Sequence, residues 1–326
     1  MLAYALRRVL LSVPILIAST FVVFVITALS KSPISDLRAK NPPPPERTIE
    51  LERQRLNLDQ PLLERYWNWL LGLFRGDFGP SVQSRMDIGA EVVDRFIVTF
   101  RLIGLAMLVA LVLAIIVGVI SAVKQYSGVD YTSTFLGFLF LSLPSFWFAI
   151  LLKQAGISFN NAVGEQVLFT IGDSSVYVTG GTWAEFTDAL GHMVLPTISL
   201  ALLSFAAWSR FQRASMLEVL NSDYVRLARA KGLRRGTVMR KHALRTALIP
   251  LTTVTALDLG AIISGAVVTE KVFQWQGAGT FLLDAIERSD VYAVQAWLLV
   301  SATFIILFNL AADLLYGVLD PRIRYA

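Results

Sequence analysis

Few residues of this sequence are suited to bond-making chemistry, and they form no recognisable catalytic pattern. The 326 residues include no cysteine and two histidines, His192 and His242. A hydrolytic site needs a nucleophile beside a base, a pair of carboxylates or an H-E-x-x-H motif, and neither histidine has such neighbours. We therefore expect no catalytic residue and no metal site. His192 is interpreted as an interfacial residue and His242 as part of a basic loop.

One carboxylate lies where a carboxylate is costly. Asp258 falls midway along an apolar run, 247–268, and a charge in a hydrocarbon environment must face protein or water. Two interpretations stay open for it. Asp258 either lines a transport path and meets an amine or a cation, or makes a structural hydrogen bond to a neighbouring helix. Asp313, nearer the end of the last apolar run, is interpreted as structural.

Basic residues are concentrated in one loop. Ten of them lie between Arg210 and Arg245. A cytoplasmic charge bias, a surface for anionic lipid or nucleic acid, and a docking surface for a soluble partner would each explain this. Lipid-binding stripes usually carry large apolar anchors, which are sparse here, and the loop lacks aromatic positions on which bases would stack. Docking is favoured, and charge bias alone remains the alternative.

A short helix is predicted inside this loop, over 223–231. Ser222 suits an N-cap, Asp223 the first turn and Lys231 the last turn. Gly232 suits the left-handed position that follows a helix. Isolated helices of this length are marginal in water, so another surface must hold this one.

The same helix has a predicted contact face. Tyr224, Leu227 and Ala228 follow one another at i, i+3 and i+4 and therefore share a face. Ala228 and Ala230 are small enough to let another surface come close. A loop that served only to place positive charge at the membrane would not need these signals for the start and end of a helix.

The elements that carry these residues are predicted to be membrane-spanning helices. Hydrophobic residues make up 55% of the chain and charged residues 16%, against about 25% charged residues in soluble domains. A bilayer core needs about 20 apolar residues. Six runs reach or approach that length: 8–29, 102–123, 135–157, 194–210, 247–268 and 295–319. We expect an all-α, polytopic membrane protein with six transmembrane helices.

The third apolar run contains the sequence LSLPSFWF. Pro144 removes a backbone donor and predicts a kink in that helix. Our candidates for a translocation path are this proline and the three residues after it, together with Asp258: Pro144, Ser145, Phe146, Trp147 and Asp258.

A polar segment, 30–94, follows the first run and is predicted to form an outer subdomain resting on the membrane. The prolines at 42–45 favour an extended connector. Residues 49–75 have the pattern of an amphipathic helix broken near 59–61. Its aromatic residues resemble an interfacial belt: Tyr66, Trp67, Trp69 and Phe74.

The distribution of Lys and Arg predicts the orientation. If the N-terminus is cytoplasmic, the inner segments carry the ten loop residues together with Arg7, Arg8, Lys124, Arg322 and Arg324. The outer loop 158–191 carries none. Cytoplasmic loops are enriched in Lys and Arg, so both termini are expected in the cytoplasm.

Seven motifs, in order along the chain, resemble importer permeases of the ABC superfamily, and above all the peptide-importer branch. They are LDQPLLERYW, RGDFG, LSLPSFW, HMVLPTISLAL, DYVRLARAKGL, HALRTALIP and DLLYGVLDPRIR. The chain looks like the first of the two permeases of an oligopeptide or dipeptide importer, and the resemblance extends from Met1 to Arg324. It departs from the family pattern at Gln276, where Trp-Pro-Gly is usual, and lacks the common Pro-Gly-Asp-Pro stretch after the first run.

The resemblance implies an ABC type I importer permease fold of four regions: 1–29, a first transmembrane helix; 30–94, the extracytoplasmic subdomain; 95–316, the permease domain with a coupling loop at 211–246; and 317–326, a cytoplasmic tail. It also implies a location in the cell inner membrane. Its coupling helix would dock on an ATPase through Asp223, Tyr224, Arg226, Ala228, Arg229, Ala230, Lys231, Gly232 and Leu233.

The resemblance further implies partners. These are a homologous second permease, two ATP-binding subunits that hold ATP and Mg²⁺, an extracytoplasmic solute-binding protein and the bilayer, with no nucleic acid. The chain itself lacks the phosphate loop G-x-x-x-x-G-K-[ST] and is expected to be neither an enzyme nor a cofactor carrier. Nickel, glutathione or another small solute remains an alternative cargo. A secondary transporter is the less favoured class, because no internal repeat is evident.

Overall fold

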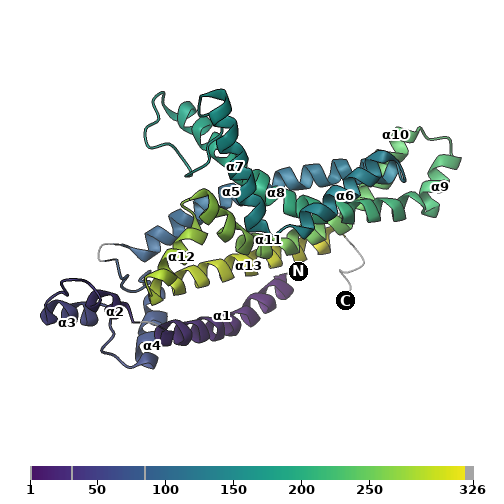
Figure 1. The fold of residues 1–326 in the computed structure, drawn as a ribbon. Helices are drawn as coiled ribbons and strands as arrows, with labels where there is room; N and C mark the ends of the chain where they lie inside the picture. Colours follow the sequence, from purple (N-terminus) through teal and green to yellow (C-terminus); the bar gives the residue numbers. More distant parts are fainter. Residues whose placement is uncertain (1, 31, 84–85, 320–326) are drawn as a thin grey trace. The chain divides into compact units, whose positions relative to one another are not determined.

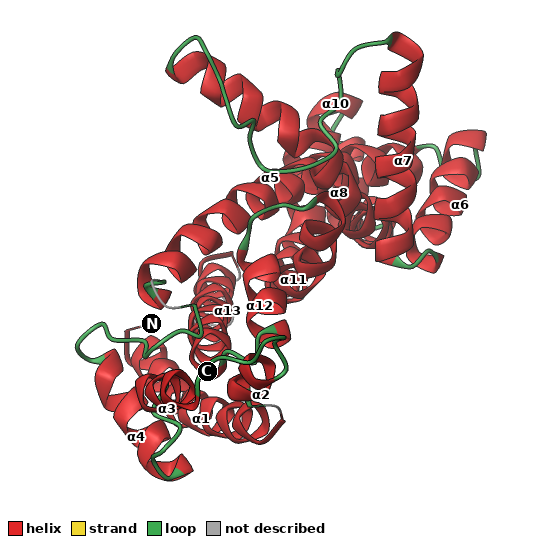
Figure 2. Cartoon of the chain, turned by 60° about the vertical axis from the view of Figure 1, so that its left-hand side comes forward, coloured by secondary structure: helices red, strands yellow, loops and turns green. Residues whose placement is uncertain are grey.

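The computed structural model describes residues 2–30, 32–83 and 86–319, and the described part is built of helices and loops (Figures 1 and 2). The helices are α1 (Leu2–Ser30), α2 (Pro33–Arg38), α3 (Glu46–Arg55), α4 (Leu62–Leu73), α5 (Ile88–Val123), α6 (Gly128–Ser142), α7 (Ser145–Val163), α8 (Thr182–Leu220), α9 (Asp223–Ala230), α10 (Arg235–Thr237), α11 (Arg245–Phe273), α12 (Ala278–Glu287) and α13 (Val291–Leu319). A π-helical segment, Val238–Leu244, joins α10 to α11. The all-α prediction is confirmed, whereas the tail from residue 320 lies outside the described residues.

The chain divides into two compact units. Unit 1 comprises Met1–Thr99 and Gln276–Leu310, and unit 2 comprises Phe100–Trp275 and Ala311–Ala326. Helices α5 and α13 therefore contribute residues to both, and each unit is described by itself below.

All six predicted apolar runs fall on helices. Within the described residues, four helices are long and apolar enough to cross a membrane, and a fifth crossing is added if the bent pair α6–α7 is one span. Helix α11 holds the predicted run 247–268, but several of its side chains lie outside the described set and it does not enter that count. The protein is an integral membrane protein of apolar helices.

The third predicted run is broken rather than kinked. The chain bends by 107° between α6 and α7, and Leu143 and Pro144 between them have extended backbones, with ψ of 134° and 131°. The clash between a proline ring and the preceding residue disfavours the helical conformation there. Pro144 thus lies just after α6 and serves as the N-cap residue of α7, so the change of direction predicted at Pro144 is present as a break between two helices rather than as a kink within one.

In unit 1, helix α4 packs on α1 through aromatic side chains. Tyr66 donates a hydrogen bond to the carbonyl oxygen of Ile17 at 3.0 Å and lies 3.0 Å from the hydroxyl of Thr20. Tyr66 and Trp69 are buried, whereas Trp67 and Phe74 are 59% and 86% exposed. The predicted aromatic belt is therefore divided between a buried face and an exposed face of one helix.

The predicted break in the amphipathic segment is also present, between α3 and α4. On α3, Arg55 donates to Glu52 through Nε at 2.8 Å. This hydrogen bond lowers the pKa of the Glu52 carboxyl below its usual value, with the Arg55 charge adding to the effect and partial burial opposing it.

The turn before α12 is held by α5. Arg95 donates through Nη1 to the side-chain oxygen of Gln276 at 2.6 Å, and Thr99 accepts a hydrogen bond from the backbone N–H of Ala278 at 2.7 Å. The N-cap residue Gly277 has no side chain to cap the helix, so Thr99 supplies the missing acceptor. Gln276, which departs from the family pattern, is thereby used in a specific contact.

In unit 2, α8 packs against α6, α7 and α11. Asn160 near the end of α7 pairs with the backbone of the following loop, accepting from Leu168 N–H at 2.9 Å and donating to its carbonyl oxygen at 2.7 Å. Lys153 donates to the carbonyl oxygen of Val272 in the last turn of α11 at 2.7 Å, where the helix dipole favours a positive charge. These contacts fold the predicted outer loop onto the helices.

Candidate functional site

Helix α9 lies in the basic loop, as predicted, and begins at Asp223. Ser222 has the extended backbone of an N-cap residue, but its side chain makes no capping bond. Its hydroxyl instead donates to the carbonyl oxygen of Val219 at 2.6 Å, which ties the start of α9 to the end of α8. Asp223 and Arg226 form an exposed ion pair at 3.5 Å.

The C-terminal end of α9 is a Schellman turn. Gly232 has φ of +78°. Its N–H donates to the carbonyl oxygen of Arg229 at 3.0 Å, and the N–H of Leu233 donates to the carbonyl oxygen of Ala228 at 3.4 Å. This pair of bonds satisfies carbonyl groups that a helix end leaves open. The left-handed glycine is confirmed, although the helix has eight residues and Lys231 is its C-cap residue.

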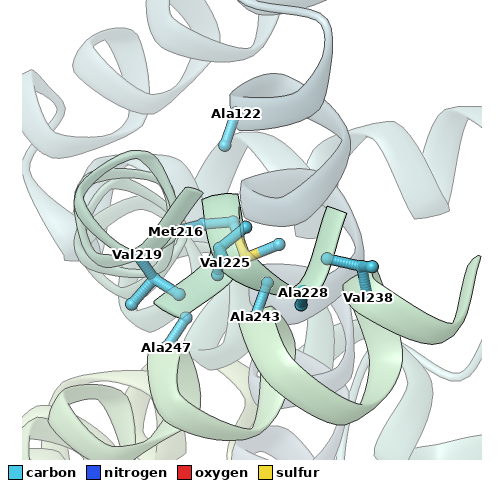
Figure 3. Close-up of a cluster of buried hydrophobic side chains, with 8 residues drawn as sticks. All are labelled: Ala122, Met216, Val219, Val225, Ala228, Val238, Ala243 and Ala247. Atoms are coloured by element: carbon cyan, nitrogen blue, oxygen red, sulfur yellow. The ribbon is translucent and has the colours of Figure 1, made fainter. Parts of the chain in front are cut away.

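The surface that holds α9 belongs to the chain itself. Val225 and Ala228 are 0% and 6% exposed. They belong to a cluster of buried side chains (Figure 3), here called the platform, whose other members are Ala122, Met216, Val219, Val238, Ala243 and Ala247. Packing on the platform explains how so short a helix is stable, because tertiary contact replaces the missing helix length.

The structure separates the three residues that were predicted to share a contact face. Ala228 and its neighbour Val225 are buried members of the platform, whereas Tyr224 and Leu227 are 43% and 56% exposed and remain available to a partner. Val225 was not among the residues predicted for this face, because the i, i+3, i+4 pattern of Tyr224, Leu227 and Ala228 does not include it. A Val–Ala pair at i and i+3 is a signal of burial that the sequence does contain.

The outer face of α9 combines apolar and basic groups. Tyr224, Leu227 and Leu233, which is 41% exposed, are large apolar side chains in solvent. The polar and small residues around them are exposed as well: Asp223, Arg226, Arg229, Ala230, Lys231 and Gly232. Exposed apolar groups ringed by charge are typical of a protein-binding surface.

The residues proposed for a translocation path lie on different helices of unit 2. Phe146 and Trp147 are 52% and 45% exposed in the first turn of α7, which begins at Ser145 after Pro144. Asp258 on α11 accepts a hydrogen bond from Nε1 of Trp208 on α8 at 2.6 Å. One of the two interpretations of Asp258, a hydrogen bond to a neighbouring helix, is thus observed. A path role for these residues stays a prediction.

The two histidines have unlike surroundings. His192 is 4% exposed and stacks on Phe169 with ring centroids 4.1 Å apart. Its ring nitrogens lie 3.1 Å from the carbonyl oxygen of Gly172 and 3.2 Å from the hydroxyl of Ser175. The residue fastens the loop before α8 to that helix. His242 belongs to the π-helical segment of the basic loop, as expected from its position.

Two family models together match nearly the whole chain. "Binding-protein-dependent transport system inner membrane component" matches residues 114–325, and the corresponding N-terminal model matches residues 1–103. The second model covers the segment that contains α1 to α4.

Curated relatives align over their full lengths. The oligopeptide transport system permease protein OppB of Mycobacterium tuberculosis is 38% identical over 324 residues, with 99% of each chain covered. The dipeptide transport system permease protein DppB of Escherichia coli K12 is 39% identical, with 100% of this chain and 99% of the relative covered. The oligopeptide permease AppB of Bacillus subtilis is 35% identical over the whole of both chains.

A solved structure shares the fold. A chain of the MetNI methionine ABC transporter, in an inward-facing conformation, aligns with a TM-score of 0.54 and 17% identity. The alignment covers 70% of this chain and 96% of that one. At this identity the likeness concerns the fold alone.

Proposed function

The chain belongs to the binding-protein-dependent transport system inner membrane components, and from this premise we propose that it is a permease subunit of an ATP-driven peptide importer. The observation that carries the proposal is α9, a short helix held by the platform on one side and exposed on the other. Relatives named as oligopeptide and dipeptide permeases support the choice of cargo.

The ATPase activity of such a transporter resides on other subunits. Two ATP-binding chains, holding ATP and Mg²⁺, would each receive a coupling helix, and α9 would be the one that this chain contributes. Tyr224, Leu227 and Leu233 would enter an apolar cleft, and Arg226, Arg229 and Lys231 would lie at its rim. Apolar anchors supply most of the affinity in an interface, and rim charges contribute less.

The chain's own contribution is to position α9 and pass its displacement to the helices. A helix fixed by a Schellman turn at one end and by the platform along its length has little freedom to move alone. Closure of the ATPases would therefore shift the platform and, with it, α8 and α11. Alternation between inward-facing and outward-facing states would follow from that shift.

The remaining partners follow from the same proposal. A homologous second permease would form the path together with this chain, and an extracytoplasmic binding protein would deliver the peptide. The protein would lie in the cell inner membrane with both termini in the cytoplasm, so that the basic loop faces the ATPases.

The proposal is tested by the variant Leu227→Glu, with Val176→Glu as the matched control. Both residues are exposed, Leu227 at 56% on α9 and Val176 at 89% in the loop before α8. The first variant places a charge in the docking surface and is expected to abolish co-purification of the ATP-binding subunits and peptide uptake. The second is expected to leave both unchanged.

Two results would contradict the proposal. Full co-purification and uptake with Leu227→Glu would show that α9 is not the docking helix. An intact complex that takes up nickel or glutathione but no short peptide would leave the permease function standing and replace the cargo.

A further inference from the structure

An ion pair in unit 2 joins the first turn of α6 to α8. Arg213 donates to Asp130 through Nε at 2.7 Å and through Nη2 at 2.8 Å, one bond to each carboxylate oxygen. The Asp130 side chain is 4% exposed and that of Arg213 is 28% exposed. Two parallel bonds fix the angle between the side chains as well as their distance.

The same carboxylate also holds α5 and the loop after it. The hydroxyl of Ser121 near the end of α5 donates to Asp130, and the backbone N–H of Tyr126 donates to it at 3.0 Å. Both oxygens of this buried group are therefore satisfied by donors from three separate segments. One side chain therefore links the end of α5, the start of α6 and the C-terminal part of α8.

This junction adjoins the platform that holds α9. Ala122, the residue after Ser121, belongs to the platform, and so does Met216, which lies one turn beyond Arg213 on α8. At Gly118, one turn earlier on α5, an added Cβ would lie 2.8 Å from Cβ of Gln212. Helices α5 and α8 are thus in close contact beside the pair, and α6 is attached to the same block.

We infer that Arg213 is a positioning residue for coupling: it fixes the start of α6 to the part of α8 that carries α9. This inference rests on the proposed function. A displacement of α9 then reaches the α6–α7 pair through a fixed joint. Without the pair, α6 would be free to lag behind α8.

Stability alone does not account for the pair. Removing two charges from water is costly, and apolar residues of similar size often replace a buried ion pair without loss of stability. What apolar side chains do not reproduce is the fixed orientation that the planar guanidinium imposes. The pair is therefore better suited to defining an angle than to raising the free energy of unfolding.

The variant Asp130→Leu/Arg213→Met tests this, because it removes both charges and leaves neither charge buried alone. Ser121 and the N–H of Tyr126 also lose their acceptor, so the yield of the assembled complex is measured first. We would reconstitute the complete transporter in proteoliposomes and measure trialanine uptake against ATP hydrolysis. The variant is expected to assemble in normal yield and to import at least tenfold less peptide per ATP. Arg213→Lys keeps the positive charge but loses the two parallel hydrogen bonds of the guanidinium group. Its peptide uptake per ATP is expected to lie between those of the wild type and the double variant. Glu52→Ala/Arg55→Ala removes an ion pair in unit 1 and is expected to behave as wild type.

A distance measurement supplies a readout that does not depend on cargo. Spin labels are placed at Thr132→Cys on α6 and Asn221→Cys after α8, both exposed positions. This chain has no cysteine of its own, and the transporter without the two substitutions, labelled in the same way, measures any signal from the partner chains. The distance distribution is expected to be narrow, and unchanged when ATP is trapped with vanadate. When Asp130→Leu/Arg213→Met is combined with the labels, the distribution is expected to be broad.

The outcomes separate the two proposals. Wild-type transport-to-ATP ratios, or a narrow distribution, in Asp130→Leu/Arg213→Met would overturn the role of Arg213. A wild-type complex that imports no trialanine would count against the proposed cargo, and the distance measurement would still decide the inference.

Discussion

At the residue scale, the backbone conformation of Gly232 restricts which residues can replace it. Its φ of +78° is left-handed, and nothing lies within 4 Å of the place a Cβ would occupy. The obstacle to a larger residue is therefore conformational rather than steric crowding. For a residue with a Cβ, the left-handed region costs about 1–2 kcal/mol.

We expect Gly232→Val to uncouple ATP hydrolysis from transport. The β-branched side chain disfavours the left-handed backbone, so the Schellman turn opens and the end of α9 frays. The expected result is peptide uptake reduced severalfold while ATP hydrolysis by the assembled complex persists. Gly236→Val is the matched control, because Gly236 is in the same loop with equal space and no positive φ. Normal uptake by Gly232→Val would contradict this account.

Asp258 offers a second test at this scale. If its main role is to accept the hydrogen bond from Trp208, Asp258→Asn keeps an acceptor and is expected to transport normally. Asp258→Leu leaves the buried indole N–H without a partner, at a cost of about 1–3 kcal/mol, and is expected to lower thermal stability. Peptide uptake and unfolding temperature, measured for both variants, distinguish a structural hydrogen bond from a role of the charge in the path. Lost uptake with unchanged stability in Asp258→Asn would instead assign the charge to the path.

At the scale of elements, the break between α6 and α7 depends on two extended residues. Proline restrains Leu143 directly, so Pro144→Ala is expected to let the two helices approach a continuous one. Spin labels at Phe138→Cys and Ile150→Cys, both about half-exposed positions, would then report a distance distribution shifted to longer values. An unchanged distribution would mean that contacts of α7 with α8 and α11 hold the bend without the proline.

The sequence predicted elements better than their ends. Apolar runs locate the part of a helix that needs hydrocarbon around it, but the backbone continues until a cap stops it. Helix α8, for example, extends from Thr182 to Leu220, well beyond the predicted run 194–210. The short helix in the basic loop was located closely because its ends carry local signals, Asp223 and Gly232.

Contacts between distant residues were beyond prediction from a single sequence. Asp130 and Arg213 are 83 residues apart, and neither lies in a sequence motif that would indicate which residue it pairs with. The hydrogen bond between Trp208 and Asp258 spans 50 residues. Such pairings follow from the three-dimensional course of the helices, which hydropathy and capping do not specify.

At the scale of the whole molecule, the chain exposes too much apolar surface to be stable by itself in water. In α1, only 11% of the residues in the most apolar window are buried, and large apolar side chains such as Leu10, Ile15 and Leu29 are exposed. In an integral membrane protein, exposed apolar surfaces of this kind face the bilayer lipid or other apolar surfaces. The outer face of α9 is exposed in the same sense, but its charged surroundings suit a soluble partner.

The composition of the platform bears on how force would travel through the protein. Four of its members are alanines, Ala122, Ala228, Ala243 and Ala247, and alanine has no side-chain torsion to adjust. Short side chains therefore make up most of the platform, and Met216 is the one long, flexible side chain among its eight members. If α9 docks on an ATPase as proposed, the alanines and valines of the platform would offer few rotamer changes by which its displacement could be absorbed.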